Sequence, residues 1–263
     1  MAIQHITNEY AIPRGRVYFD RFDANGAPTG EVPLGNCPGF TFTAETEKSE
    51  HYSSEAGLAE KDAAMIVRVN RTGSLTCDNF SLDNLALFVS GTTETQSQSA
   101  GDMTDEAHKV YQGRIYQLGV SSGAPAGVRN VTDVVVTSSD GLTTYVLGAD
   151  YNVDLELGRI QIIKGGTIAD ATNIKVDYKT TLKSWQRVKS GATAEVSGAL
   201  RVIADNASGT NRDWFFPKVT LTPSGDLPVI QEGTDFTTME FGVEVLKSAN
   251  REALYIDGRP VAV

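Results

Sequence analysis

Residues of the types that most often do chemistry are few in this chain, and the three histidines come first. His5, His51 and His108 each stand in a polar stretch. None has a second His or a Cys at the spacing that metal ligands need. We therefore expect three ordinary surface histidines and no metal site.

The two cysteines, Cys37 and Cys77, lack the Cys-x-x-Cys spacing of zinc and redox sites. Residues 1–15 have neither the basic region nor the apolar core of a signal peptide. We therefore expect the chain to fold in a cytoplasm, where both cysteines remain thiols.

Acidic residues offer two further kinds of chemistry. Glu45 and Glu47 are close enough in sequence for acid–base work, but their polar stretch contains nothing that would raise a carboxyl pKa by desolvation. Residues 19–26 (FDRFDANG) resemble a calcium loop, yet placing Gly26 at the invariant glycine puts Arg21 at the first ligand position. The chain also lacks nucleotide-binding glycine motifs and a serine nucleophile elbow. We expect no enzyme and no cofactor.

The composition is that of a globular protein, and the net charge is acidic. Of 263 residues, 40% are hydrophobic and 21% charged, which is typical of a globular protein. No apolar run reaches the roughly 18 residues of a spanning helix, so no membrane partner is expected. The net charge is −10, and such a chain repels nucleic acid on average, because binding to phosphates requires basic side chains.

Much of the negative charge falls in two polar segments. Residues 43–62 hold six acids and two lysines, and residues 88–106 hold four acids without Lys or Arg. The first segment has too few apolar side chains to bury a face and is too long for an ordinary connection. We expect a long loop there.

Alternating apolar residues predict strands along most of the chain. Residues 15–22 place Val17 and Phe19 on one face. Residues 239–246 alternate in the same way, with Met239, Phe241, Val243 and Val245 opposite Glu240, Gly242, Glu244 and Leu246. Residues 78–89 are the best helix candidate, with Asp78 as N-cap and Gly91 as the stop.

Residues 113–183 differ in texture from the rest, because short β runs alternate with turn clusters every eight to twelve residues. Strands of the first kind resume after this part. We expect an all-β protein of two domains: residues 1–112 and 184–263 form one discontinuous domain, and 113–183 form an inserted small β-sandwich.

Several motifs together resemble one family. They are RVYFD (16–20) followed by GEVPLGNCP (30–38), SEHYSSEAG (49–57), and TCDN (76–79) leading into NLALF (84–88); the likeness resumes in residues 201–230 and 236–246. In this combination the chain resembles the tail tube, or major tail, proteins of long-tailed bacteriophages. Residues 113–183 resemble the small β or immunoglobulin-like domains often inserted in tail proteins.

The resemblance implies two packed antiparallel β-sheets, in a sandwich or barrel, with one flanking α-helix and a long extended loop. It implies homohexameric rings that stack into the tail tube, the conduit for DNA ejection into the host. The implied partners are other copies of the chain and the tape measure, tail terminator and tail tip proteins. Double-stranded DNA passes through the lumen without specific binding. The protein would be assembled in the host cytoplasm and reside in the virion tail.

The resemblance also implies which residues meet neighbouring subunits. The long polar loop would reach the next subunit and the adjacent ring through Glu45, Glu47, Glu50, His51, Tyr52, Glu55, Leu58, Glu60, Lys61 and Asp62. Acids expected to face the lumen are Asp20, Glu240 and Glu244.

Two alternatives stay open. The inserted domain could attach the protein to a host surface or carbohydrate, for which Tyr145, Tyr151 and Tyr178 are the available aromatic residues. A hydrolase with an unrecognised acidic pair is the third interpretation.

Overall fold

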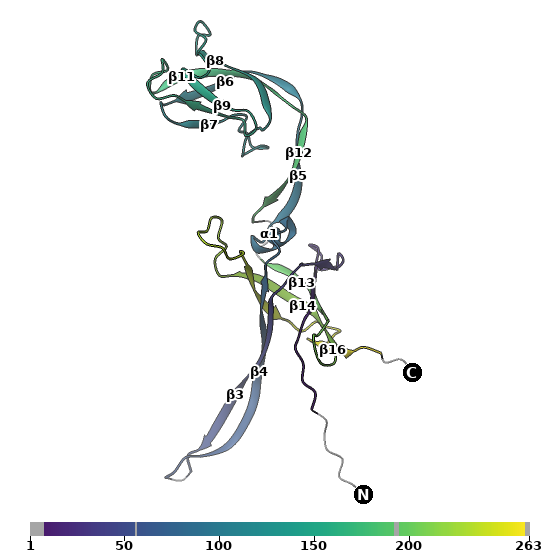
Figure 1. The fold of residues 1–263 in the computed structure, drawn as a ribbon. Helices are drawn as coiled ribbons and strands as arrows, with labels where there is room; N and C mark the ends of the chain where they lie inside the picture. Colours follow the sequence, from purple (N-terminus) through teal and green to yellow (C-terminus); the bar gives the residue numbers. More distant parts are fainter. Residues whose placement is uncertain (1–7, 56, 192–194, 261–263) are drawn as a thin grey trace. The chain divides into compact units, whose positions relative to one another are not determined.

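The structure is a computed structural model that describes residues 8–55, 57–191 and 195–260. It consists mainly of antiparallel strands, which confirms the expected all-β class. The chain forms two compact units (Figure 1). One, here called the discontinuous unit, comprises residues 1–94 and 188–263. The other, the central unit, comprises residues 95–187.

The discontinuous unit contains one eight-stranded sheet in the order β2-β1-β13-β14-β15-β4-β3, with β16 also paired to β14. Its strands are β1 (Gly15–Arg21), β2 (Val32–Pro33), β3 (Gly39–Ser53), β4 (Glu60–Cys77), β13 (Val196–Ala204), β14 (Arg212–Ser224), β15 (Met239–Val245) and β16 (Tyr255–Gly258).

This one sheet encloses a single hydrophobic core. The expectation from the sequence was that two separate sheets would pack against each other. Strands far apart in the sheet order supply the same cluster, because Val17 and Phe19 of β1 and Leu75 of β4 all belong to it. The sheet must therefore curl over its own concave face. Gly198 of β13, next to a register shift with β14, is needed because a Cβ there would lie 2.4 Å from the carbonyl oxygen of Asp20. The order ends at β2 and β3, so the described strands do not close into a barrel.

The alternation predicted for residues 239–246 is confirmed over β15. Met239, Phe241 and Val243 are buried in the core, while Glu240 and Glu244 are exposed on the opposite face. A strand with one buried and one polar face is typical of an antiparallel sheet covered on one side.

The predicted helix is α1 (Leu82–Phe88), and it buries Ala86 and Leu87. Its N-cap is Ser81 and not Asp78, since the Ser81 hydroxyl accepts the N–H of Asn84 at 3.2 Å. The helix ends before Gly91: its C-cap is Val89, and the left-handed residue that follows is Ser90 (φ 49°) and not the predicted glycine. The Gly91 N–H closes the end by donating to the carbonyl of Ala86 at 2.7 Å.

The central unit has two three-stranded sheets, β7-β10-β9 and β6-β11-β8, around a core of its own. Its strands are β6 (Gly101–Val110), β7 (Ile115–Gln117), β8 (Val131–Ser138), β9 (Tyr151–Asp154), β10 (Arg159–Ile162) and β11 (Thr172–Thr180). The unit is longer than the expected 113–183, because β6 pairs with β11 from Gly101 to Val110. The polar stretch 88–106 is therefore largely strand.

Both chain crossings between the units run through a two-stranded ribbon of β5 (Thr92–Gln98) and β12 (Lys183–Lys189). Within it, Lys189 Nζ lies 2.6 Å from Glu94 Oε2. The chain therefore leaves the discontinuous unit through β5 and returns to it through β12, and these two strands are paired.

Candidate assembly interface

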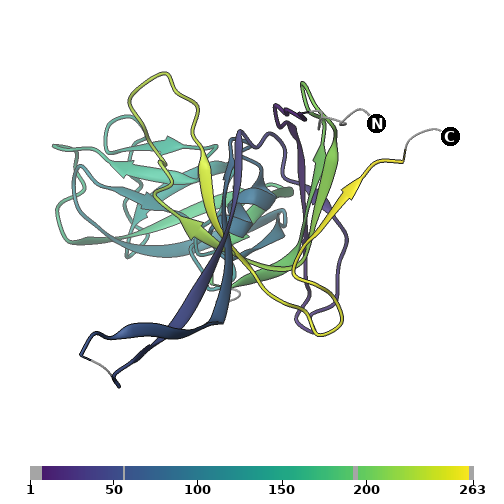
Figure 2. The ribbon, with the colours of Figure 1, turned by 90° about the horizontal axis from the view of Figure 1, so that it is seen from below.

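The acidic segment 43–62 is not a loop. It belongs to a long β-hairpin in which β3 and β4 stay paired from Gly39↔Thr76 out to Ser53↔Glu60. The neighbouring strand β15 pairs with β4 only from Thr72 to Cys77. Beyond that point the two strands run on as a separate ribbon, residues 44–71, here called the arm (Figure 2).

The arm has two faces because side chains alternate along β3 and its partners on β4 follow them. At two register shifts β4 has one extra residue each, Val67 and Asp62. On β3, the even-numbered residues after Phe40 and Phe42 share the face that these two phenylalanines turn to the core. This core-side face of the arm contains Ala44, Thr46, Lys48, Glu50 and Tyr52, opposite Arg71, Val69, Ile66, Ala64 and Lys61. The outer face contains Glu45, Glu47, Ser49, His51 and Ser53, opposite Asn70, Arg68, Met65, Ala63 and Glu60.

Apolar side chains of the arm are open to solvent. Met65 is 69% exposed, Ile66 57%, Tyr52 53% and Val69 44%. A two-stranded ribbon on its own is at best marginally stable, and contiguous exposed apolar side chains mark interaction sites. The arm therefore has the character of an element that is completed by a partner.

The charges of the arm are divided between its faces. Among the paired residues, the core-side face carries Lys48, Lys61 and Arg71 against Glu50 alone, whereas the outer face carries three glutamates against Arg68. Asp62, at a register shift, contacts His51 of the outer face. Ion pairs within the ribbon join Glu50 to Lys61, and Glu47 to Arg68 at 3.1 Å. The Lys61 ammonium, helped by the Tyr52 hydroxyl, holds the pKa of Glu50 below its usual value. Exposed pairs of this kind add little stability.

All ten residues predicted to meet neighbouring subunits lie on the arm. Eight are on its strands, and Glu55 and Leu58 are in the turn at its tip. His51 forms a 2.5 Å contact with Asp62. The residues predicted from the sequence to meet neighbouring subunits did not include Ile66, Val69 and Arg71. The structure adds them because β4 runs through eighteen residues, more than a usual strand.

The outer face of the arm continues over the sheet as a polar surface. The register of β3, β4, β15 and β14 places hydroxyl and acidic side chains on one side; they are Thr41, Thr43, Thr72, Ser74, Thr76, Thr222, Ser224, Glu240 and Glu244. Residues 39–43, 72–77, 220–224 and 239–245 contain no Lys or Arg. Glu240 and Glu244 are thus exposed on one acidic, hydroxyl-rich sheet face.

Asp20, the third acid predicted to face a lumen, does not lie on this surface. It is only 8% exposed, and its Oδ1 accepts the N–H groups of Thr29 and Gly30, both at 2.8 Å. The carboxylate holds the turn after β1. The turn residues 23–30, rich in Gly and Pro, were the sequence signal for this role.

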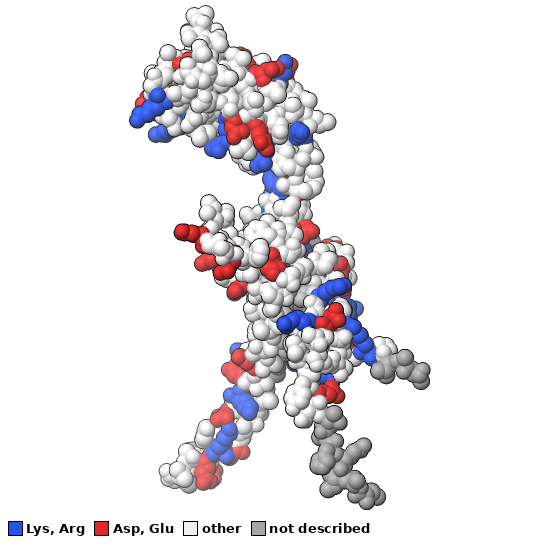
Figure 3. Space-filling model, in the orientation of Figure 1, with Lys and Arg blue, Asp and Glu red and all other residues white. Residues whose placement is uncertain are grey.

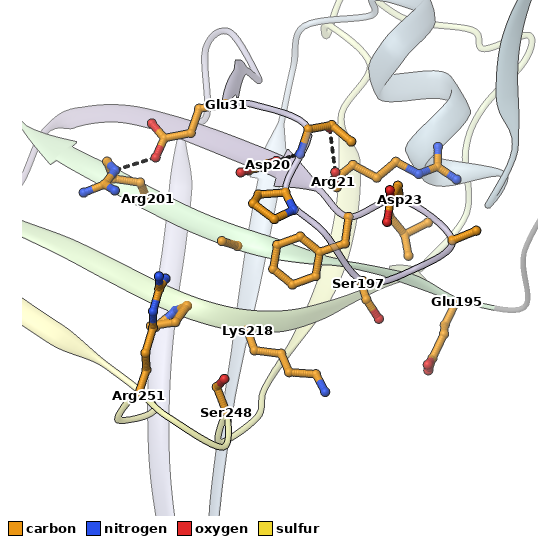
Figure 4. A pocket seen from close by; sticks show the side chains of 18 of the residues that line it. Asp20, Arg21, Asp23, Glu31, Glu195, Ser197, Arg201, Lys218, Ser248 and Arg251 are labelled. Atoms are coloured by element: carbon orange, nitrogen blue, oxygen red, sulfur yellow. Dashed lines mark hydrogen bonds and ion pairs between the residues drawn. The ribbon is translucent and has the colours of Figure 1, made fainter.

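A hollow of about 1200 Å³ opens beside this turn, between β13, β14 and residues 248–251 (Figure 4). Arg201 contacts Glu31 at 2.6 Å and lies 4.2 Å above the ring of Phe215. Lys218 and Arg251 line the same hollow. Basic and acidic side chains both line the hollow, so it has no single sign of charge.

Four acids line the hollow, and three of them, Asp20, Asp23 and Glu31, have structural partners. Asp23 accepts the N–H groups of Asn25 at 2.8 Å and Ala27 at 2.9 Å, and these bonds lower its pKa. Asp20 caps the same turn, and Glu31 pairs with Arg201. Among the described residues, no group of three or more His, Cys, Asp and Glu is placed to hold a metal ion.

The two cysteines are free thiols that meet at the end of β4 opposite the arm. Their sulfur atoms lie 3.1 Å apart, with Cys77 buried and Cys37 partly buried. The contact with Cys37, together with burial, raises the pKa of Cys77. The same contact lowers the pKa of Cys37. Their separation of forty residues in sequence gave no sign of this contact.

Comparison with known proteins identifies a family. The model of the family described as Protein of unknown function UCP028589 matches residues 10–254. The chain belongs to this family. No curated protein matches the chain. In the part of the chain that the structure describes, no helix is long and apolar enough to cross a membrane.

The aromatic residues considered for carbohydrate binding lie in the core of the central unit. Tyr151 is 3% and Tyr178 2% exposed, and Tyr145 packs against the same cluster. These rings are therefore not available as an exposed sugar platform.

Histidine positions differ from the expectation in one case. His108 is mostly buried and contacts Glu106 at 2.9 Å, whereas His51 is exposed as predicted. His5 lies outside the described residues. Glu106 also accepts the hydroxyl of Tyr178 at 2.5 Å and the N–H of Gly119 at 2.9 Å. Burial alone would raise the pKa of Glu106, but these bonds and His108 lower it overall.

Proposed function

We propose that this chain is a structural virion protein that assembles into hexameric rings, stacked into a phage tail tube that conducts DNA into the host. The observation that carries the proposal is the arm, a long ribbon with exposed apolar side chains and no covering element in the described chain. Contacts to other copies would bury these side chains. The proposal agrees with the resemblance in residues 16–88, and the hexameric number rests on that resemblance alone.

The edge of the sheet supports the same function. β3 is the last strand of the sheet order over its fifteen residues, so no other described strand pairs with its outer edge. An uncovered edge is a template for pairing with another chain. Pairing between copies would join their sheets into one wall around a channel.

The acidic sheet face suits the wall of a DNA channel. Glu240 and Glu244 project from a hydroxyl-rich surface, and the strand segments that form it hold no Lys or Arg. Phosphates are repelled by such a wall, whereas a basic wall would bind the duplex and stall it. At physiological salt the repulsion extends about 8 Å, so it acts near the wall.

The assembly itself is tested by light scattering and negative-stain electron microscopy of the purified protein over a concentration series. We expect rings and hollow tubes above a threshold concentration. A protein that stays monomeric at every concentration, with and without a molecular crowder, contradicts the proposal.

The channel face is tested by charge reversal. Tubes of the Glu240→Lys/Glu244→Lys variant are expected to bind double-stranded DNA in a salt-dependent way, while wild-type tubes do not bind it. The control is Glu156→Lys/Asp154→Lys, two exposed acids of the central unit, which changes net charge equally. Equal DNA binding by both variants would show that the sheet face does not line the channel.

A further inference from the structure

An apolar groove lies at the end of β4 that is opposite the arm. It measures about 460 Å³ and is lined by residues beside α1 and by the loop 225–238 between β14 and β15. Phe80 and Leu85 form one wall, and Leu227, Val229 and Phe236 form the other. Val229 is 89% and Phe236 92% exposed, so these side chains contribute little to the folding of the single chain. Neighbouring exposed apolar side chains of this kind mark interaction sites.

The chain segments that form this groove are acidic, and Asp78 lines it. Residues 78–88 and 225–238 contain no Lys or Arg, and their acids are Asp78, Asp83, Asp226, Glu232 and Asp235. Figure 3 shows Asp and Glu side chains gathered over the loop between β14 and β15. A fitting ligand would combine apolar side chains with positive charge.

The core-side face of the arm has this combination. Ile66, Val69 and Tyr52 supply exposed apolar surface, and Lys48 and Arg71 lie on the same face. The outer face of the arm is acidic and would be repelled by the rim of the groove. Only one face of the ribbon therefore matches the groove.

The arm cannot reach the groove of its own chain. β4 runs from Glu60 at the arm to Cys77, and the next residue, Asp78, lines the groove. Eighteen residues of strand at about 3.3 Å each span roughly 60 Å, and Ile66 is still about 40 Å from Asp78. Figure 1 shows the arm leaving the unit at the end opposite α1. Contact between the two surfaces requires a second copy.

We propose that the core-side face of the arm of one copy docks in the acid-rimmed groove of another copy. This inference rests on the proposed self-assembly and names the two surfaces that meet. The contact joins different surfaces of the two copies, so it repeats head to tail and builds an open series. Such a contact suits the stacking of rings.

Charge reversal tests the pairing of the two surfaces. Lys48→Glu/Arg71→Glu in the arm and Asp226→Lys/Asp235→Lys in the groove are each expected to raise the threshold concentration for assembly at least tenfold. Combining all four substitutions in one chain restores opposite charges and is expected to bring the threshold back to within about threefold of wild type. The control is Asp154→Lys/Glu156→Lys, two exposed acids of the central unit that belong to neither surface, with a change below threefold.

Cross-linking locates the contact directly. Ile66→Cys and Phe236→Cys are made as separate variants, mixed, and treated with a short bismaleimide under assembly conditions. We expect a covalent dimer in the mixture and not in either variant alone. Met65→Cys, the neighbouring residue on the outer face, replaces Ile66→Cys as the control and is expected to give no dimer. Wild type measures the background from Cys37 and Cys77.

The outcomes separate the two proposals. Assembly that gives no dimer between residues 66 and 236 and tolerates the groove reversals overturns the docking inference and leaves the proposed function standing. Failure of the wild type to assemble overturns the proposed function and the docking with it. A dimer in the mixture with charge rescue supports both.

Discussion

The arm and the central unit are both excursions from the eight-stranded sheet, and they treat the same residue types in opposite ways. In the central unit, Ile160, Ile174 and Val176 are fully buried in a core that the unit supplies itself. In the arm, Ile66 and Val69 remain in solvent. The difference lies in whether the excursion forms layers that can cover one another.

This contrast separates folding from assembly. Burying one large aliphatic side chain contributes about 1.5–3 kcal/mol. The central unit gains this free energy when the single chain folds, since its two sheets share one core. The arm gains it only when another molecule covers it. Substitutions in the two regions should therefore be detected by different measurements.

Deleting the central unit is the largest change and tests whether the discontinuous unit folds and assembles without it. Residues 95–187 are replaced by Asn-Gly, a turn that suits two paired strands and connects Glu94 to Val188. We expect the shortened protein to fold and assemble, because the core of the discontinuous unit has no residue in the deleted part. Urea unfolding by circular dichroism should show one transition fewer than in the full chain. Loss of folding in the shortened chain would contradict the independence of the two units.

Matched truncations of isoleucine come next in size. Ile174→Ala removes a fully buried side chain and should lower the free energy of unfolding of the central unit by about 2–5 kcal/mol. Ile66→Ala removes a side chain that is 57% exposed and should change the stability of the monomer by less than about 0.5 kcal/mol. The second variant should instead raise the assembly threshold. Equal losses of monomer stability would mean that the arm is already buried in the single chain.

Glu106 should make the free energy of unfolding of the central unit depend on pH. Its pKa in the folded state lies below the ordinary value of 4.5. The ionised carboxylate therefore adds stability above that pH, and this stability is lost as the pH falls through the folded-state pKa. Glu106→Gln should cost about 1–3 kcal/mol at neutral pH and should flatten the loss of stability below pH 4.5. Urea unfolding between pH 3 and 7 measures both effects, and an unchanged pH profile would exclude Glu106 as their source.

The smallest expected effect concerns the helix at the groove. Ser81→Ala removes the N-cap of α1 and should cost about 0.5–2 kcal/mol in thermal unfolding. Ser81→Asp keeps an accepting oxygen and serves as the control. A large loss with aspartate would show that Ser81 acts by packing and not as a cap.

The sequence allowed prediction of those features that depend on local spacing. The alternation in β15, a helix within residues 78–89 and the all-β class follow from periodicity and turn residues. The burial of Asp20 could have been read from the turn that it caps. The cap at Ser81 was missed because Asp78 offers an equally good side chain three residues earlier.

Features that depend on residues distant in sequence could not be predicted from local spacing. The arm looked like a loop because residues 43–53 are polar, and their strand form depends on pairing with residues 60–72. The strand β6 was assigned to the wrong unit because its partner, β11, begins 62 residues after β6 ends. Tyr151 and Tyr178 looked available as surface aromatics, although cross-strand packing places them in a core.

Hydrogen exchange of the arm, compared between dispersed and assembled protein, shows whether another copy covers this ribbon on assembly. The account predicts that amides of residues 60–71 exchange quickly in the dispersed protein and become protected on assembly, while the core strand β11 is protected equally in both states. If the arm exchanges equally in both states, it is not the element that assembly completes, and the account is contradicted.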